Sequence, residues 1–226
     1  MSGILSIVAT PIGNLEDITL RALRTLKECD VIYAEDTRVI SKLLARYEIS
    51  KPLQRLDAAT EAEKAKEIIG RLEEGEKVVF VSDAGTPGVS DPGARLVARV
   101  REFAAEATIE AIPGASALTA LLSIAGLGSD SFTFLGFLPH KKGRQTAMKK
   151  IATSEHPVVL YESPHRILKL LKELETFAPQ CRVTIGRELT KMHEEVLVGA
   201  PQELAKTLEE KDAVRGEFVV IIEPHN

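Results

Sequence analysis

The sequence predicts an α/β protein built from two α/β units with a ligand cleft between them. Short apolar runs of strand length alternate with longer stretches whose apolar residues have helical spacing, which is typical of repeated βα units. Loops rich in glycine and proline follow several predicted strands, and loops at the ends of parallel strands bind ligands. With 226 residues, 44% of them hydrophobic, the chain is long enough to bury one large core or two smaller ones.

The most informative stretch is residues 78–93, VVFVSDAGTPGVSDPG. It opens with four apolar residues and no polar alternation, which predicts a strand buried on both faces. Residues 82–93 then hold three glycines, two prolines, two aspartates, two serines and a threonine, which predicts a multiply turned loop. Loops of this length are mostly functional, and a complicated turn without a ligand is the alternative.

The elements of the first unit follow in order. Strands are predicted over residues 4–9, 31–34, 53–56, 78–81 and 108–112, with a turn at residues 10–14. Helices are predicted from near Asp17, from Thr60 to about residue 74, and over residues 94–105; Thr60 and Glu63 have capping-box spacing. Because strands and helices alternate, we expect a parallel sheet with helices on its faces.

A second glycine-containing turn at residues 113–117 leads into a helix of small residues, and we place the domain boundary there, giving domains 1–114 and 115–226. The second unit is expected to hold strands over residues 132–137, 158–161, 182–187, 194–198 and 216–222. Ser163 lies two residues before His165, a spacing compatible with nucleophilic chemistry. A helix N-cap at Ser163 with Pro164 at the first helical position explains the same residues more simply.

Composition and motifs exclude several classes of function. A net charge of −4, few aromatics and no Trp argue against nucleic-acid binding by bulk charge or by a base-stacking platform. No G-x-G-x-x-G follows the first strand, and no G-x-x-x-x-G-K-[ST] occurs, so the usual dinucleotide and phosphate loops are absent from the sequence. The five histidines lack metal-ligand spacing, so no metal is expected.

The cysteines and the amino terminus indicate the compartment. Cys29 and Cys181 lie far apart in no metal or redox spacing, which predicts buried, reduced thiols. The first residues contain only a short apolar run with no basic region before it, so neither a signal peptide nor a membrane span is expected. We therefore expect a soluble, cytoplasmic protein.

Seven motifs are spread along most of the chain, in the order VATPIGNLEDIT, EDTR, SDAGTPGVSDPG, PGASA, GFLP, YESPHR and RELTK, and the resemblance they carry runs from about residue 4 to residue 222. With them the sequence resembles the ribosomal RNA small subunit methyltransferase I family, a branch of the tetrapyrrole-methylase-like (class III) S-adenosylmethionine-dependent methyltransferases. The resemblance implies two α/β domains of the tetrapyrrole methylase-like fold and a homodimer. It also implies that S-adenosylmethionine binds in the interdomain cleft, and that the substrate is the ribose 2′-hydroxyl of a cytidine in 16S rRNA, within the small ribosomal subunit.

The resemblance further implies which residues hold the cofactor. They come from the loops at strand ends, where backbone groups and small side chains can approach a ligand closely. The predicted set is Pro11, Ile12, Ala84, Gly85, Thr86, Val89, Ser116 and Ala117, with Tyr161 and Gly199 from the second domain.

The chemistry of methyl transfer suggests the remaining candidates. In-line positioning of the 2′-oxygen supplies most of the rate, and a lysine or carboxylate can take its proton. The catalytic candidates are Glu35, Asp36, Glu188 and Lys191, whereas guanidinium geometry suits Arg38 and Arg187 to phosphate binding. For each of these residues an interdomain ion pair is the alternative.

The most basic segment, KKGRQTAMKK at residues 141–150, contains no acidic residue. It predicts RNA binding through Lys141, Lys142 and Arg144, with a solvated helix face as the alternative.

Two other functions stay open. One is methylation of a small tetrapyrrole or a protein side chain on the same scaffold. The other is a non-enzymatic module that senses S-adenosylmethionine or a nucleotide.

Overall fold

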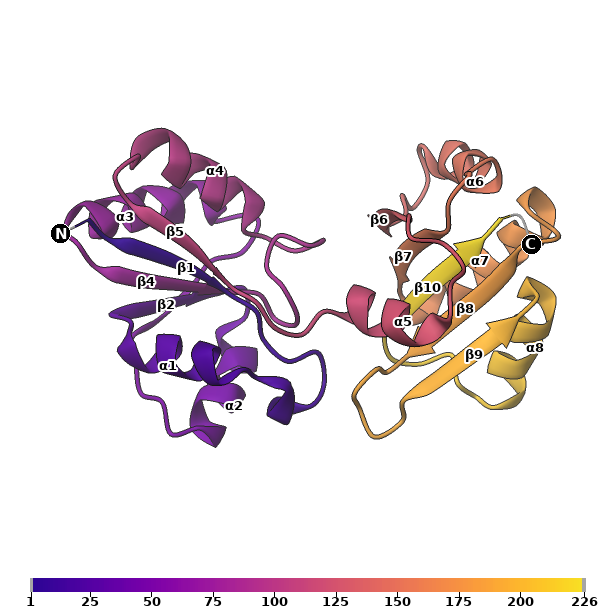
Figure 1. Ribbon diagram of the computed structural model, residues 1–226, viewed down its shortest axis with the longest axis horizontal. Helices are drawn as coiled ribbons and strands as arrows, with labels where there is room; N and C mark the ends of the chain where they lie inside the picture. The colour runs from indigo at the N-terminus through magenta and orange to yellow at the C-terminus, as the bar shows by residue number, and fades with distance from the viewer. Residues whose placement is uncertain (1, 225–226) are drawn as a thin grey trace. The chain divides into compact units, whose positions relative to one another are not determined.

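The computed structural model describes residues 2–224, and the chain divides into two compact units, Met1–Ser116 and Ala117–Asn226 (Figure 1). The division falls directly before helix α5 (Ala117–Ala125), whereas the sequence placed it after Gly114. Each unit has its own five-stranded sheet and its own buried core.

Five parallel strands form the sheet of the first unit, in the order β3-β2-β4-β1-β5. They are β1 (Ile4–Val8), β2 (Val31–Ala34), β3 (Leu53–Arg55), β4 (Lys77–Val81) and β5 (Thr108–Ile112). Val8 pairs with Val81 on one side and with Ile112 on the other, so β1, β4 and β5 end at the same level. The predicted parallel sheet is confirmed, and the loops that follow these strands begin side by side.

Helices cover both faces of this sheet (Figure 1). Helices α1 (Leu20–Glu28) and α2 (Thr37–Arg46) pack on one face, and α3 (Glu61–Glu73) and α4 (Ala94–Phe103) pack on the other. Successive side chains of β4 point to opposite faces of the sheet, and both sets are apolar. Val79 and Val81 lie in the core under α1 and α2, while Val78 and Phe80 lie in the core under α3 and α4. All four side chains are fully buried, which confirms the strand predicted to be buried on both faces.

The centre of the sheet is a topological switch point. Strands β1 and β4 are neighbours, but β1 leads to α1 on one face and β4 leads to α4 on the opposite face. Open α/β sheets bind ligands beyond the carboxyl ends of the strands at such a point. The loops after β1 and β4 are therefore the best candidates for a binding site in this unit.

Two local predictions in the first unit were wrong. Asp17 lies in a short 3-10 turn, η1 (Leu15–Asp17), and α1 begins later, after Thr19 caps it by accepting a hydrogen bond from the Ala22 amide at 3.0 Å. Thr60 is the N-cap of α3, but its side chain makes no capping bond. Its hydroxyl instead bonds to Asp57, because the turn before the helix competes for that side chain.

The sheet of the second unit is mixed, with the order β6-β7-β10-β8-β9. Its strands are β6 (Thr133–Phe137), β7 (Val158–Glu162), β8 (Arg182–Arg187), β9 (Glu195–Gly199) and β10 (Phe218–Glu223). Strands β6 and β7 run parallel, and the other neighbours run antiparallel, including the predicted pair β8 and β9. The sequence did not predict that β10 would insert between β7 and β8.

Helices α6 (Arg144–Ala152), α7 (Pro164–Phe177) and α8 (Pro201–Glu210) cover one face of the second sheet. Helix α5 lies on the opposite face, where a Cβ added at Gly186 would come within 2.8 Å of Leu121. Ser163 is the N-cap of α7 with Pro164 next to it, as predicted, although the serine side chain makes no capping bond.

Both cysteines are buried and unpaired, as predicted, and burial raises the pKa of each thiol to about 11. Within residues 2–224, no helix is long and apolar enough to cross a membrane.

Candidate functional site

The loops that follow β1 and β4 are bonded to each other. Thr10 and Gly85 form an isolated bridge in which the Thr10 amide donates to the Gly85 carbonyl at 2.9 Å and the Gly85 amide donates to the Thr10 carbonyl at 3.0 Å. The Thr10 hydroxyl also donates to the Ser82 carbonyl at 3.3 Å. These contacts fix the start of the glycine-rich loop directly over the switch point.

The loop after β5 joins the same cluster. The Thr86 hydroxyl donates to the Ala115 carbonyl at 3.3 Å. Gly85 has φ +77, and a Cβ added there would lie 3.4 Å from Ile12 Cγ2 and 3.7 Å from the Ala115 oxygen. Residues 10–14, 82–93 and 113–116, which we call the switch-point loops, therefore meet around Gly85.

The switch-point loops hold most of the predicted cofactor residues. Pro11, Ile12, Gly85, Thr86 and Ser116 are buried or half-buried in this cluster, while Ala84 is exposed. Val89 lies on a tight turn in which its amide donates to the Thr86 carbonyl at 3.3 Å. The site thus consists of small side chains and closely approachable backbone, as a cofactor with amino-acid and ribose groups requires.

Tyr161, Gly199 and Ala117 belong to the second unit. Tyr161 is the penultimate residue of β7 and packs its ring against Phe134 and Phe137, with centroids 5.1 and 5.7 Å apart. Gly199 ends β9, where a Cβ would come within 3.2 Å of a Glu203 carboxylate oxygen. Their assignment to the cofactor stays a prediction.

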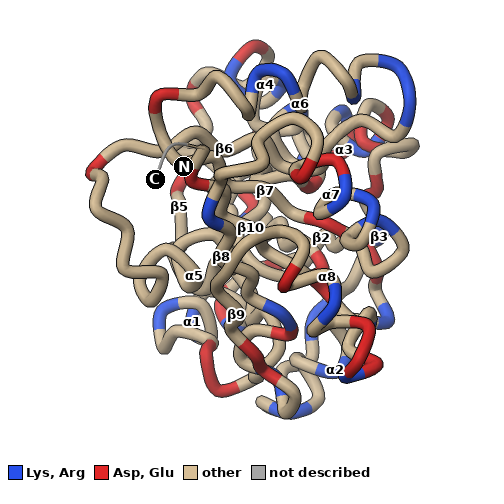
Figure 2. Tube along the Cα trace, turned by 90° about the vertical axis from the view of Figure 1, so that its right-hand side faces the viewer, with Lys and Arg blue, Asp and Glu red and all other residues tan. Residues whose placement is uncertain are grey.

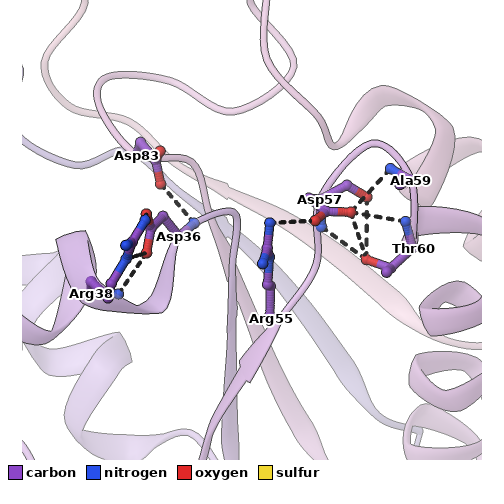
Figure 3. A network of polar contacts seen from close by, with 7 residues as sticks. All are labelled: Asp36, Arg38, Arg55, Asp57, Ala59, Thr60 and Asp83. Carbon is purple, nitrogen blue, oxygen red and sulfur yellow. Dashed lines mark hydrogen bonds and ion pairs between the residues drawn. The ribbon is translucent and has the colours of Figure 1, made fainter.

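Acidic residues gather at the carboxyl ends of β2, β3 and β4 (Figure 3). The Asp36 amide donates to Asp83 Oδ1 at 2.8 Å, which ties the turn after β2 to the turn after β4. Asp36 caps α2 through the Arg38 amide and also holds the Arg38 guanidinium at 2.5 to 3.1 Å. Arg38 therefore lies beside the switch-point loops with its side chain 88% exposed.

The two predicted catalytic carboxylates on this turn differ in basicity. Hydrogen bonds from Arg38 lower the pKa of Asp36 to about 2, so this carboxylate is a weak base. Burial, followed by the charges of Asp83 and other nearby aspartates, raises the pKa of Glu35 above its usual range. Burial also raises the pKa of Asp83. The sequence analysis did not name Asp83 as a catalytic candidate, although it lies two residues after the end of β4. Glu35 is the better proton acceptor of the predicted pair.

The turn after β8 carries the other catalytic candidates in an ion-pair network. Lys191 Nζ donates to Glu188 at 2.8 Å and to Glu217 at 2.9 Å, and Glu188 also accepts from the Glu217 amide at 3.0 Å. Glu188 and Thr190 both have positive φ, at 50° and 65°, so the turn holds a conformation that such residues rarely adopt. Strain of this kind clusters at functional sites.

Lys191 is a cation in this arrangement. Burial opposes its charge, but the hydrogen bonds to Glu188 and Glu217 outweigh burial and raise the pKa of the ammonium group. Burial likewise acts against the charge of Glu188, but the hydrogen bonds from Lys191 and the Glu217 amide and the charges of Lys191 and Arg187 together outweigh burial, so the pKa of Glu188 is lowered. Neither group is a strong proton acceptor while the network is intact.

The basic segment, residues 141–150, contains four exposed lysines and one buried arginine. Lys141 and Lys142 are exposed in the loop before α6, and Lys149 and Lys150 are exposed in its last turn. Figure 2 marks the positions of Lys and Arg along the chain trace in blue. Arg144 is only 3% exposed. Its Nε donates to Glu173 at 2.8 Å, and its NH1 lies 3.7 Å from Glu162. The prediction that Arg144 binds substrate is corrected, because its guanidinium is used inside the second unit.

We expect Arg144→Ala to lower the free energy of unfolding by about 3 kcal/mol, because it removes a buried guanidinium that pairs with the buried Glu162 and the half-buried Glu173. Urea denaturation measures this loss, and Lys149→Ala, which removes an exposed charge from the same helix, should change it by less than about 0.5 kcal/mol. If Arg144→Ala has the same urea midpoint as the unchanged protein, the ion pairs of Arg144 do not stabilise the fold, and the prediction that Arg144 binds substrate would be restored.

Arg187 is also engaged. Its Nε donates to the Arg215 carbonyl at 3.0 Å, and its NH1 lies 3.8 Å from Glu195. Of the two arginines proposed for phosphate, Arg38 is the more exposed, at 88% against 13% for the side chains.

Comparison with known proteins places this fold and site in a family. Residues 5–205 match the family described as Tetrapyrrole (Corrin/Porphyrin) Methylases. The chain is 46% identical over 222 residues to "Ribosomal RNA small subunit methyltransferase I" of Borrelia garinii subsp. bavariensis, covering 96% of this chain and 97% of that protein. The chain belongs to the ribosomal RNA small subunit methyltransferase I family, within the tetrapyrrole methylases.

Other relatives of the family agree. The protein of the same name from Thermotoga maritima is 42% identical over 220 residues, covering 97% of this chain and 98% of its own. Among solved structures, a uroporphyrin-III-C-methyltransferase from Thermus thermophilus has a TM-score of 0.70 at 20% identity, over 98% of this chain and 94% of that one. A Thermus thermophilus structure complexed with S-adenyl homocysteine has a TM-score of 0.65 at 20% identity, over 97% and 96% of the two chains. The predicted fold class is confirmed.

Within the described part of the chain, no group of three or more His, Cys, Asp and Glu side chains is arranged to hold a metal ion.

Proposed function

We propose that this protein transfers a methyl group from S-adenosylmethionine to the ribose 2′-oxygen of a cytidine in 16S rRNA of the small ribosomal subunit. The observation that carries the proposal is similarity at 42 to 46% identity, over nearly the whole chain, to proteins named ribosomal RNA small subunit methyltransferase I. The geometry of the switch-point loops supports it, because they offer a backbone-lined site at the position where this class of sheet binds ligands.

The switch-point loops would hold the cofactor. Gly85 lets the backbone approach the ligand, Ile12 supplies an apolar contact, and Thr86 keeps the loop against Ala115. When bound, S-adenosylmethionine supplies a methyl group already activated on a sulfonium sulfur. The protein therefore has to place the acceptor and exclude competing water more than it has to activate the methyl group.

The proposed reaction needs a proton acceptor as well as alignment. The ribose oxygen forms a bond to the methyl carbon, the carbon–sulfur bond breaks with its electron pair left on sulfur, and the hydroxyl proton leaves to a base. Glu35 is the predicted catalytic residue best suited to take that proton, because burial and neighbouring aspartates raise its pKa. Lys191, held as a cation, is better suited to bind or orient the negatively charged RNA.

RNA phosphates would be bound by exposed cations. Arg38 presents its guanidinium beside the switch-point loops, and Lys141 and Lys142 extend from the loop before α6. The protein carries a net charge of −4, so phosphate contacts must be concentrated locally rather than spread over the surface. The homodimer and the cytoplasmic location implied by the family resemblance stay predictions.

Changing Lys141 and Lys142 together to alanine is expected to flatten the salt dependence of small-subunit binding by about one to two units of log–log slope, since each phosphate contact contributes about 0.7 to 0.9. Affinity for S-adenosylmethionine should not change. The measurement is subunit binding over a salt series, and the matched control is the Lys149/Lys150 double alanine variant, which removes the same charge at the other end of α6. An unchanged slope in the Lys141/Lys142 variant would return these lysines to a solvated surface.

The function is tested by transfer of a radiolabelled methyl group to small ribosomal subunits from a strain that lacks this gene. We expect labelling of 16S rRNA in those subunits and none in subunits from the parent strain, where the position is already modified. Uroporphyrin and bulk protein serve as alternative acceptors in parallel reactions. Label in either of them, with none in RNA, would replace the proposal by one of the alternative activities.

A further inference from the structure

We propose that Glu61 is a positioning residue that holds the end of the 82–93 loop in the conformation that binds the cofactor. This inference rests on the proposed function. Glu61 is the first residue of α3, yet the residue is only 5% exposed, and such burial is unusual for a glutamate.

The Glu61 carboxylate caps a different helix. Glu61 Oε1 accepts hydrogen bonds from the Gly93 amide at 3.2 Å and from the Leu96 amide at 3.0 Å. Gly93 is the N-cap of α4 and has no side chain to satisfy the free amides of the first turn. A negative charge at this end of α4 also complements the helix dipole. Helix α3 thus supplies the cap that α4 lacks.

Gly93 cannot be replaced by a residue whose side chain would cap α4. Its φ is +126, and a Cβ added there would lie 2.8 Å from the Phe80 ring at the centre of the sheet. The close approach to Phe80 requires glycine, and glycine in turn requires a capping group from elsewhere. Glu61 meets that requirement.

The capped end of the loop is connected to the predicted cofactor residues. The Thr10–Gly85 bridge and the Thr86–Ala115 bond hold the beginning of the loop, and Glu61 holds its end. Between them, the Gly88 amide donates to the Pro92 carbonyl at 3.1 Å. A shift of Pro92 and Gly93 would therefore move Gly88 and the neighbouring Val89, which is in the predicted cofactor set.

The test is calorimetric binding of S-adenosylhomocysteine to four variants of the full chain. Glu61→Ala removes the acceptor, and Glu61→Asp keeps the charge but shortens its reach, so both should raise the Kd about tenfold or more. Glu61→Gln keeps an oxygen at the same reach and should stay within about threefold of the unchanged protein. Glu63→Ala, an exposed change on the same helix, is the matched control and should bind normally.

A second readout separates positioning from stability alone. Amide hydrogen exchange should speed up at Gly88, Val89 and Gly93 in the alanine and aspartate variants, with exchange in the β1–β4 pairing unchanged. If Glu61→Ala does not fold, the aspartate variant carries the test. In the unchanged protein the Gly93 and Leu96 amides should be protected, and exchange as fast as that of an exposed loop would overturn the proposal.

The outcomes distinguish this inference from the proposed function. If the unchanged protein does not bind S-adenosylhomocysteine, the proposed function fails. If it binds, and Glu61→Ala or Glu61→Asp binds equally well, only the positioning role of Glu61 is refuted. Equal weakening in the alanine and glutamine variants would also refute it, because the role depends on an oxygen acceptor at that place.

Discussion

Replacing Gly85 by leucine is expected to weaken S-adenosylmethionine binding by about a hundredfold. Gly85 has φ +77, which a leucine adopts only with strain, and the new side chain would grow toward Ile12 and the Ala115 carbonyl. The change therefore distorts the Thr10–Gly85 bridge and fills the centre of the switch-point loops at once. Isothermal titration calorimetry measures the loss of affinity directly.

Gly126→Leu is the matched control for this experiment. Gly126 has φ +65 and no heavy atom within 4 Å of an added Cβ, so it carries similar backbone strain without the proposed ligand contact. The control variant should bind the cofactor normally. If Gly85→Leu also binds normally, the switch-point loops are not the cofactor site.

Replacing Lys191 by alanine is expected to slow single-turnover methyl transfer about tenfold to a hundredfold and to leave the cofactor Kd within about twofold. The change removes a cation that Glu188 and Glu217 hold in a fixed place on a strained turn. Glu188→Ala should slow the reaction too, because it releases Lys191 and the Glu217 amide. Quenched-flow or manual single-turnover assays with saturating cofactor make the measurement, and normal rates in both variants would remove this turn from the mechanism.

The pH dependence of the same assay separates the roles of Lys191 and Glu35. The pKa of Lys191 is raised, so its ammonium form persists below the ordinary lysine pKa and is lost only as the pH rises through the still higher value in the folded protein. Lys191 should thus add no limb to the rate profile between about pH 6 and 9. The pKa of Glu35 is raised as well, so its basic form is lost on acidification at a higher pH than for an ordinary glutamate. A rate that falls on the acid side supports Glu35 as the base.

The meeting of the glycine-containing loops was predictable, because the carboxyl ends of parallel strands lie at one edge of a sheet. The apolar run before Ser82 buries both faces of β4, and parallel strands bring the loops after β1, β4 and β5 to one edge. Motifs at those strand ends therefore had to lie together. The approach of Ile12 to Gly85 lies beyond that register and depends on the isolated antiparallel bridge between Thr10 and Gly85.

The side-chain partners were not predictable, because they come from distant segments. Arg144 belongs to a run with no acid in it, but folding brings Glu162 and Glu173 to its guanidinium. The sequence analysis named Glu63, and not Glu61, as a capping residue, because capping-box spacing concerns only the helix that contains the residue. Glu61 instead accepts a hydrogen bond from the Leu96 amide at the start of a different helix, α4. Lys191 was predicted as a possible base, and only its contacts with Glu188 and Glu217 show that it stays charged.

The most direct test of the central claim is the chemical position of the transferred methyl group. Labelled 16S rRNA from the methyl-transfer reaction is hydrolysed in alkali, which cleaves RNA only where a free 2′-hydroxyl can attack the neighbouring phosphate. A methyl group on the ribose oxygen blocks that attack, so the account predicts that the label is recovered in an alkali-resistant dinucleotide whose first nucleoside is cytidine. Label recovered in mononucleotides would mean that a base is methylated, and would contradict it.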